Sequence, residues 1–177
     1  MTEKKTLESE AGFRIFLGEL FEITTAMFKE LGEIRPVAHV AMRVNPETGE
    51  KFEKPGIITA LCPSLESERE KDMWVAAIRD LCSRSNAVAV VVANEAWMVA
   101  AERDEVDDNG HMKVRPVDHP NRIEVVTMMV EHASFGSEMW TARIIRDGDE
   151  AHLGEFSKGP GDIRGRFTQF IPQRAMN

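Results

Sequence analysis

The stretch 87-AVAVVVANEAWMVA-100 decides the fold of this chain, because it opens with seven consecutive apolar residues. A run of this kind between turn residues is typical of a β-strand that is buried on both faces of its sheet. Asn94 and Glu95 interrupt the run, and a carboxylate in a buried strand is costly unless it is paired or reaches the surface. The sequence therefore predicts a central strand in which Glu95 is either paired structurally or part of a site.

The segments before this strand predict a strand–helix–strand unit. Residues 56–62 are strand-like, and residues 64–84 carry an apolar face at helical spacing. Ser67 and Glu70 are placed for a capping box at the start of that helix, and Ser64 after Pro63 is an alternative start. Short connections between the three elements predict a right-handed crossover and a parallel pair of strands.

The rest of the chain adds one helix and several hairpins. Phe and Leu residues recur at three- and four-residue spacing over residues 7–31, with Thr6 as the expected N-cap and Gly32 as the expected end. Asp147 and Gly148 predict a tight hairpin turn. The remaining expected strands are residues 36–44, 123–132, 138–146, 150–156 and 163–171.

Together these elements predict a single α+β domain over residues 1–177. We expect a mixed, mainly antiparallel sheet of about six strands, with two helices packed on one face. The strands 87–100 and 123–132 are apolar on both sides, so helices on one face alone leave apolar surface uncovered. This pattern predicts a homo-oligomer, most simply a twofold homodimer.

Composition and charge argue against several classes of function. The 177 residues carry a formal net charge of −8, and an acidic chain repels phosphate backbones, which argues against direct nucleic-acid binding. No apolar run approaches the ~18 residues of a membrane span, and the first residues lack the pattern of a secretion signal. Cys62 and Cys82 form neither a disulfide framework nor a zinc motif. We therefore expect a cytoplasmic protein, without a membrane partner.

Nucleotide and metal cofactors find little support in the motifs. The chain has neither a dinucleotide-binding fingerprint nor a phosphate-binding loop, so we expect no cofactor. The sharpest enzyme hypothesis is a metal-assisted hydrolase built on the long loop at residues 102–121, because loops of this length are often functional. That loop holds the candidate metal ligands His111, Asp118 and His119. Glu95 and His119 are the candidate catalytic pair, but the histidine spacing matches no known ligand motif.

A structural ion pair is the competing interpretation of Glu95. Arg122 or Arg143 could neutralise a buried carboxylate without any chemistry, and buried charges are usually paired. We favour this interpretation over catalysis. The residues that a binding site in this region would use are Asn94, Glu95, Asp118, His119, Arg122 and Arg143.

Two segments of the chain, Asn-Glu-Ala-Trp-Met at 94–98 and His-Pro-Asn-Arg at 119–122, carry a family resemblance. The chain resembles small bacterial or phage proteins with a similar Glu-Ala-Trp segment, followed by a Pro-Asn-Arg or Pro-Asp-Arg segment that opens the next strand. The resemblance covers about the middle third of the chain. It implies a single domain of prokaryotic or phage type and no particular activity.

The sequence favours a non-enzymatic protein-interaction domain, an adaptor or regulator that acts through protein contacts. This hypothesis depends on the acidic surface, the excess apolar sheet face and the lack of a recognisable catalytic constellation. One alternative is the hydrolase-like enzyme that uses Glu95 and His119. A second alternative is an acidic inhibitor that competes for a nucleic-acid-binding protein.

Overall fold

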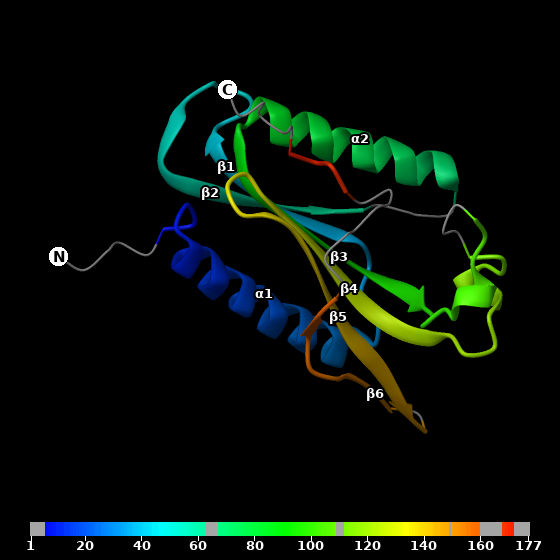
Figure 1. Ribbon diagram of the computed structural model, residues 1–177. Helices are drawn as coiled ribbons and strands as arrows, with labels where there is room; N and C mark the ends of the chain where they lie inside the picture. Colours follow the sequence, from blue (N-terminus) through cyan, green and yellow to red (C-terminus); the bar gives the residue numbers. More distant parts are fainter. Residues whose placement is uncertain (1–5, 63–66, 109–111, 149, 160–167, 172–177) are drawn as a thin grey trace.

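A computed structural model describes residues 6–62, 67–108, 112–148, 150–159 and 168–171 of the chain. Two α-helices and one antiparallel sheet, with short 3-10 helices at Arg103–Glu105 and Pro116–Asp118, make up this part of the molecule (Figure 1), which confirms the predicted α+β class. The helices are α1 (Glu10–Leu31) and α2 (Glu68–Arg84), and the strands are β1 (Val37–Val44), β2 (Lys51–Leu61), β3 (Ala87–Met98), β4 (Ile123–His132), β5 (Gly136–Asp147), β6 (Glu150–Leu153) and β7 (Ser157–Lys158).

The strands follow one another across the sheet in the order β2-β1-β3-β4-β5-β6, and the short β7 also pairs with β5. Every pairing among these strands is antiparallel, so the expected parallel pair is wrong. β2 and β3 do run in the same direction, but β1 lies between them and pairs with both. β1 and β2 form a hairpin across Asn45–Gly49, which leaves one free edge on each strand, and the chain that returns from α2 pairs with the free edge of β1.

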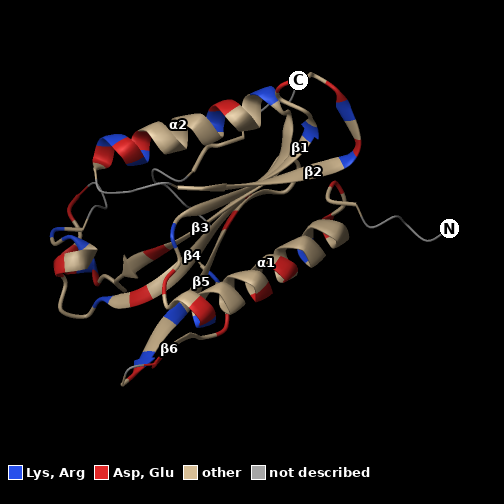
Figure 2. Cartoon of the chain, turned by 180° about the vertical axis from the view of Figure 1, so that it is seen from behind, with Lys and Arg blue, Asp and Glu red and all other residues tan. Residues whose placement is uncertain are grey.

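The two helices lie on opposite faces of the sheet (Figures 1 and 2), which corrects the expectation that both pack on one face. Phe13 and Leu17 of α1 share a core with Val91 of β3, whereas Trp74 of α2 shares a second core with Val90. Successive residues of a strand point to opposite faces, so the apolar run of β3 supplies both cores.

This arrangement removes the reason for which the sequence predicted a dimer. Residues 88–93 are fully buried within one chain, because a helix covers each face of β3. Residues 88–93 therefore leave no apolar face for another subunit to cover, and a homodimer would have to use another surface.

Residues 168–171 lie on the α2 face beside β4 and form no strand, and the rest of the strand expected at 163–171 lies outside the described residues. Phe170 is buried in the same core as Trp74. The buried carboxylate of Glu131 accepts hydrogen bonds from the backbone N–H groups of Gln169, Phe170 and Ile171, the last two at 2.8 and 3.1 Å. One acidic side chain of β4 thus anchors the segment 168–171 on the sheet.

The helix ends follow capping chemistry. The capping box of Ser67 and Glu70 is confirmed at the start of α2, and Gly32 ends α1 in the left-handed conformation with φ of 72°. The expected N-cap at Thr6 is wrong, because the Ser9 hydroxyl accepts the backbone N–H of Gly12 at 3.2 Å. α1 therefore begins three residues later than the first residue of the expected helix.

Candidate functional site

The structure gives Glu95 a backbone partner. Its Oε1 atom accepts the N–H of Ile34 at 2.7 Å, in the connection between α1 and β1. Burial raises the pKa of Glu95, and the nearby carboxylate of Glu124 adds to this effect, whereas the Ile34 hydrogen bond opposes it. Glu95 thus holds the α1–β1 connection against β3, which is a structural role that needs no ion pair.

Neither arginine expected to pair with Glu95 binds it. Arg143 faces the other side of the sheet, because it stands opposite Val125, which in turn stands opposite Ala96, the residue after Glu95. Arg122 instead lies over the ring of Trp97, 4.8 Å from its centroid. The register of the strands decides which side chains share a face with Glu95, and the sequence alone does not reveal that register.

His119 is buried and both of its ring nitrogens are engaged. The backbone N–H of Asn121 donates to Nδ1 at 3.1 Å, which leaves the proton on Nε2 to face Glu105 Oε1 at 2.9 Å. A histidine bonded in this way has no free lone pair for a metal ion or for a general base. The contact also lowers the pKa of Glu105, after a larger effect from the backbone N–H of Glu102.

The other candidate site residues are distributed among separate contacts. Asp118 pairs with Arg115 in its own loop, and Asn94 accepts the Thr127 hydroxyl across the β3–β4 pair at 3.0 Å. His111 lies outside the described residues. Within the part of the chain that the structure describes, no three His, Cys, Asp or Glu side chains stand together as a metal site.

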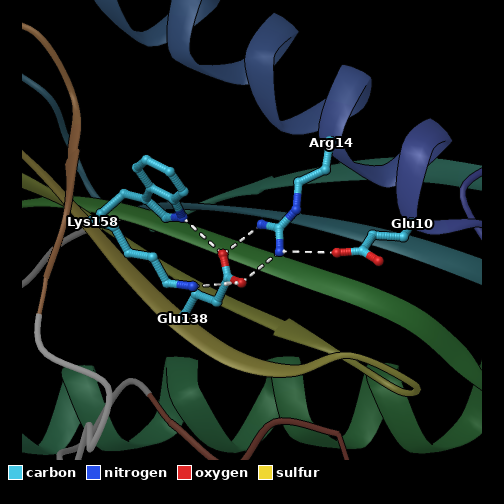
Figure 3. Close-up of polar contacts among 5 residues, drawn as sticks. Glu10, Arg14, Glu138 and Lys158 are labelled. Carbon is cyan, nitrogen blue, oxygen red and sulfur yellow. Dashed lines mark hydrogen bonds and ion pairs between the residues drawn. The ribbon is translucent and has the colours of Figure 1, made fainter.

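The strongest charged cluster is centred on Glu138 of β5 (Figure 3), which the sequence analysis missed. Arg14 of α1 donates to both carboxylate oxygens at 2.6 Å, and Lys158 of β7 donates at 3.0 Å. The indole N–H of Trp140 adds a fourth donor at 3.1 Å. The hydrogen bonds from Arg14 lower the pKa of Glu138 to about 2, although burial opposes them.

This cluster fastens α1 to the sheet rather than moving protons. A carboxyl group with a pKa of about 2 stays ionised near neutral pH and cannot serve as a general acid there. Arg14 and Glu138 are 124 residues apart in sequence, so no local spacing signals their contact. Only the placement of α1 over β5 brings them together.

The outer edge of β2 is the surface that the fold leaves open. Among the described residues, β2 ends the strand order of the sheet and pairs with β1 alone. Of the thirteen exposed large apolar side chains in the described part of the chain, four belong to this one strand: Phe52, Ile57, Ile58 and Leu61. The last three of them lie in its second half. Leu61 is 63% exposed and Ile57 is 51% exposed.

Backbone geometry shows which groups of this edge are open. The N–H of Cys62 donates to the carbonyl of Pro36, just before β1, at 2.8 Å. In an antiparallel pair the two backbone groups of every second residue point toward the partner, and those of the residues between point away. From the register of Ala60 with Ala38, the N–H and C=O groups of Ile57, Thr59 and Leu61 therefore point to the outer edge.

The two halves of β2 differ in how they protect this edge. In the first half, β2 advances from Lys51 to Gly56 while β1 advances only from Val44 to Met42, which is a bulge. That half also contains Pro55, which has no N–H, and the charged residues Glu53 and Lys54. Bulges, prolines and charges are the usual means of preventing strand addition, and the second half of β2 has none of them.

We compared the chain with models of protein families, with curated proteins and with solved structures. None of the three comparisons found a match. Among the described residues, no helix combines the length and the apolar character needed to cross a membrane.

Proposed function

We propose that this chain is a protein-interaction domain, an adaptor or regulator rather than an enzyme, that binds an extended segment of protein along the outer edge of β2. The observation that carries the proposal is the set of open backbone groups at Ile57, Thr59 and Leu61, flanked by exposed apolar side chains. An extended peptide that adds to such an edge gains affinity from main-chain hydrogen bonds and specificity from alternate side chains.

The side chains that an enzyme would use support this proposal indirectly. Glu95 holds a backbone N–H, and His119 is bonded at both ring nitrogens. No observation on the described residues favours the hydrolase or the acidic inhibitor over a binding domain. We also propose that the domain works in a reducing compartment such as the cytoplasm, because Cys62 and Cys82 are buried and are not joined in a disulfide. The resemblance to small bacterial or phage proteins remains a proposal about its origin.

Selection of binding peptides on the immobilised chain tests this function. Random nonamer peptides displayed on phage are selected at a surface density that keeps the protein molecules apart. Edge binding predicts enriched peptides with apolar residues at alternate positions. These peptides should protect the amide protons of residues 57, 59 and 61 from exchange.

Two substitutions of Thr59 form a matched pair for this test. Thr59→Pro removes an N–H that points away from β1, so it blocks the edge without removing a β1–β2 hydrogen bond. Thr59→Val keeps that N–H but loses the hydroxyl contact with His39 Nδ1, which Thr59→Pro also loses. We expect the peptides to bind the Val variant as they bind wild type and the Pro variant at least tenfold more weakly. Peptides that bind the Pro variant equally well, or a selection that enriches no peptide, would contradict the proposal.

A further inference from the structure

We propose that the segment bound at this edge is the same edge of a second copy of the chain, with two β2 strands paired antiparallel about a twofold axis through Thr59. This inference rests on the proposed function, because it uses the same open edge. The three residues with outward backbone groups, Ile57, Thr59 and Leu61, are evenly spaced around Thr59. A twofold axis at Thr59 therefore gives each of these residues a partner from the same set, and it satisfies all of their N–H and C=O groups.

Other registers leave part of the edge unpaired. A twofold axis one residue earlier, at Ile58, places Leu61 opposite Pro55 of the second copy, which has no N–H to donate. Pro55 also lies in the bulged half of β2, where the regular ladder with β1 is interrupted. The axis at Thr59 uses only residues from the regular half of the strand.

The side chains of this edge are complementary to themselves in the same register. On the face that α1 covers, Ile57 stands opposite Leu61 of the second copy at both ends, and Thr59 stands opposite Thr59. On the α2 face, Ile58 stands opposite Ala60. Apolar pairs and Thr–Thr pairs are among the favourable cross-strand combinations of antiparallel sheets.

Charge also permits this contact between two acidic molecules. The chain carries a net charge of −8, yet it has no charged residue between Lys54 and Glu66. Figure 2 shows the same contrast along β2, which is charged near its turn and uncharged toward its far end. Two like-charged copies can therefore bring these edges together without placing like charges opposite each other.

The size of the contact sets its expected strength. A stable interface buries about 800 Å² on each partner. This edge offers the backbone groups of three residues and the exposed side chains of Ile57, Ile58 and Leu61, which together provide less area than that. We therefore expect a dimer that dissociates in the micromolar range and exchanges subunits quickly.

A charge-swap experiment tests both the contact and its register. Ile57→Lys and Leu61→Glu each place a charge opposite an apolar residue when the variant pairs with itself. When the two variants are mixed, the new lysine at position 57 meets the new glutamate at position 61, and the other end keeps its native Leu61–Ile57 pair. We expect each variant alone to dimerise at least tenfold more weakly than wild type, and the mixture to recover a heterodimer, measured by sedimentation velocity and native mass spectrometry.

The control is a mixture of Ile57→Lys with Ile57→Glu. It brings the same charges together, but position 57 does not meet position 57 in the proposed register, so this mixture should stay weak. Recovery with this control would overturn the register. Wild-type protein that stays monomeric at several hundred micromolar, or single variants that dimerise as wild type does, would overturn the dimer. Circular dichroism verifies that each variant is folded.

The outcomes separate this inference from the proposed function. Monomeric wild-type protein that still selects peptides sensitive to Thr59→Pro overturns the dimer and leaves the binding edge in place. A monomer that selects no such peptides overturns both. A heterodimer recovered only when Ile57→Lys is mixed with Leu61→Glu supports the second copy as the partner.

Discussion

Three glutamates of the sheet, Glu95, Glu131 and Glu138, are alike in chemistry and differ in what they bind. Glu95 holds one backbone N–H, Glu131 holds three, and Glu138 holds an arginine, a lysine and an indole. Burial raises the pKa of Glu95, while hydrogen bonds, first of all from Arg14, lower the pKa of Glu138 to about 2. The same side chain therefore responds to pH in opposite ways at two positions of one sheet.

Glu138→Gln should cost stability that depends on pH. The pKa of Glu138 in the folded chain, about 2, lies below its ordinary value of 4.5, so the unfolded chain binds this proton more readily. The stabilisation by the carboxylate is therefore complete above about pH 4.5 and is lost as the pH falls toward 2. We expect a loss on the order of 3 kcal/mol at pH 7 that shrinks toward pH 3, measured by urea unfolding.

Glu10→Gln is the matched control for that substitution. Glu10 approaches the same arginine, at 3.7 Å, but its side chain is 67% exposed. An exposed pair of this kind contributes about 0–1 kcal/mol. If Glu138→Gln gave a loss that did not change with pH, the ionised carboxylate would not be the source of the stabilisation.

Glu95→Gln should be tolerated at pH 7. The amide keeps an acceptor for the Ile34 N–H and removes a charge that burial disfavours. Folding raises the pKa of Glu95 above its ordinary value. The stability that this carboxyl group contributes is therefore present at pH values below its ordinary pKa and is lost as the pH rises through its pKa in the folded chain. We expect the Gln variant to gain stability relative to wild type as the pH rises from about 4 to 7, measured by urea unfolding.

Glu95→Ala provides the contrast, because it removes the acceptor. Leaving the Ile34 N–H without a partner should cost about 1–3 kcal/mol at pH 7. A Gln variant as unstable as the Ala variant would mean that the negative charge itself is required, as in an ion pair or a functional site.

At the scale of elements, one side chain fixes the position of a whole segment. Glu131 of β4 binds three consecutive backbone N–H groups in residues 169–171, and Arg79 of α2 donates to the carbonyl of Thr168 at 2.9 Å. Phe170 then fills the core between α2 and the sheet. These contacts tie residues 168–171 to β4 and α2, which lie far from them in sequence.

Glu131→Gln should release this segment. A neutral amide has one acceptor oxygen, and its NH₂ group faces N–H donors, so at least one buried donor loses its partner. We expect a loss of about 2 kcal/mol or more, together with faster amide exchange at residues 169–171. Glu124→Gln, on the same strand but paired with Arg146 near the surface, is the control and should leave that exchange unchanged. Unchanged exchange in the Glu131 variant would show that Phe170 and Arg79 hold the segment without the carboxylate.

At the scale of the whole molecule, two cores share one set of strands. β1 and β3 contribute alternate residues to the core under α1 and to the core under α2. If β1 or β3 unfolds, both cores lose part of their packing at once. We therefore expect the fold to behave as one cooperative unit.

One substitution in each core tests this cooperativity. Leu17→Ala in the α1 core and Ile78→Ala in the α2 core should each destabilise the chain by about 2–5 kcal/mol. Each variant should keep a single unfolding transition, with far-UV circular dichroism and tryptophan fluorescence in agreement. Trp140 reports on the α1 core and Trp74 on the α2 core, so separate transitions at the two probes would contradict a shared core.

Much of the secondary structure was open to prediction because its signals are local. The buried character of residues 87–93 follows from their apolar run, and the capping box of Ser67 and Glu70 follows from a spacing of three residues. The strands expected at 123–132 and 138–146 match β4 and most of β5. The candidate site fared differently, because the partners of Glu95 and His119 depend on register and on the path of loops.

The sequence by itself determined the α+β class, the two helices and the central double-sided strand, since periodicity and capping act between near neighbours. Only the tertiary structure decided which face each helix covers, that β1 separates β2 from β3, and that Arg14 meets Glu138. It also decided that the second half of β2 forms an open edge, because an edge is a property of strand order and not of the strand. The contacts that distinguish these outcomes join residues tens to more than a hundred positions apart, and no pattern within a segment encodes them.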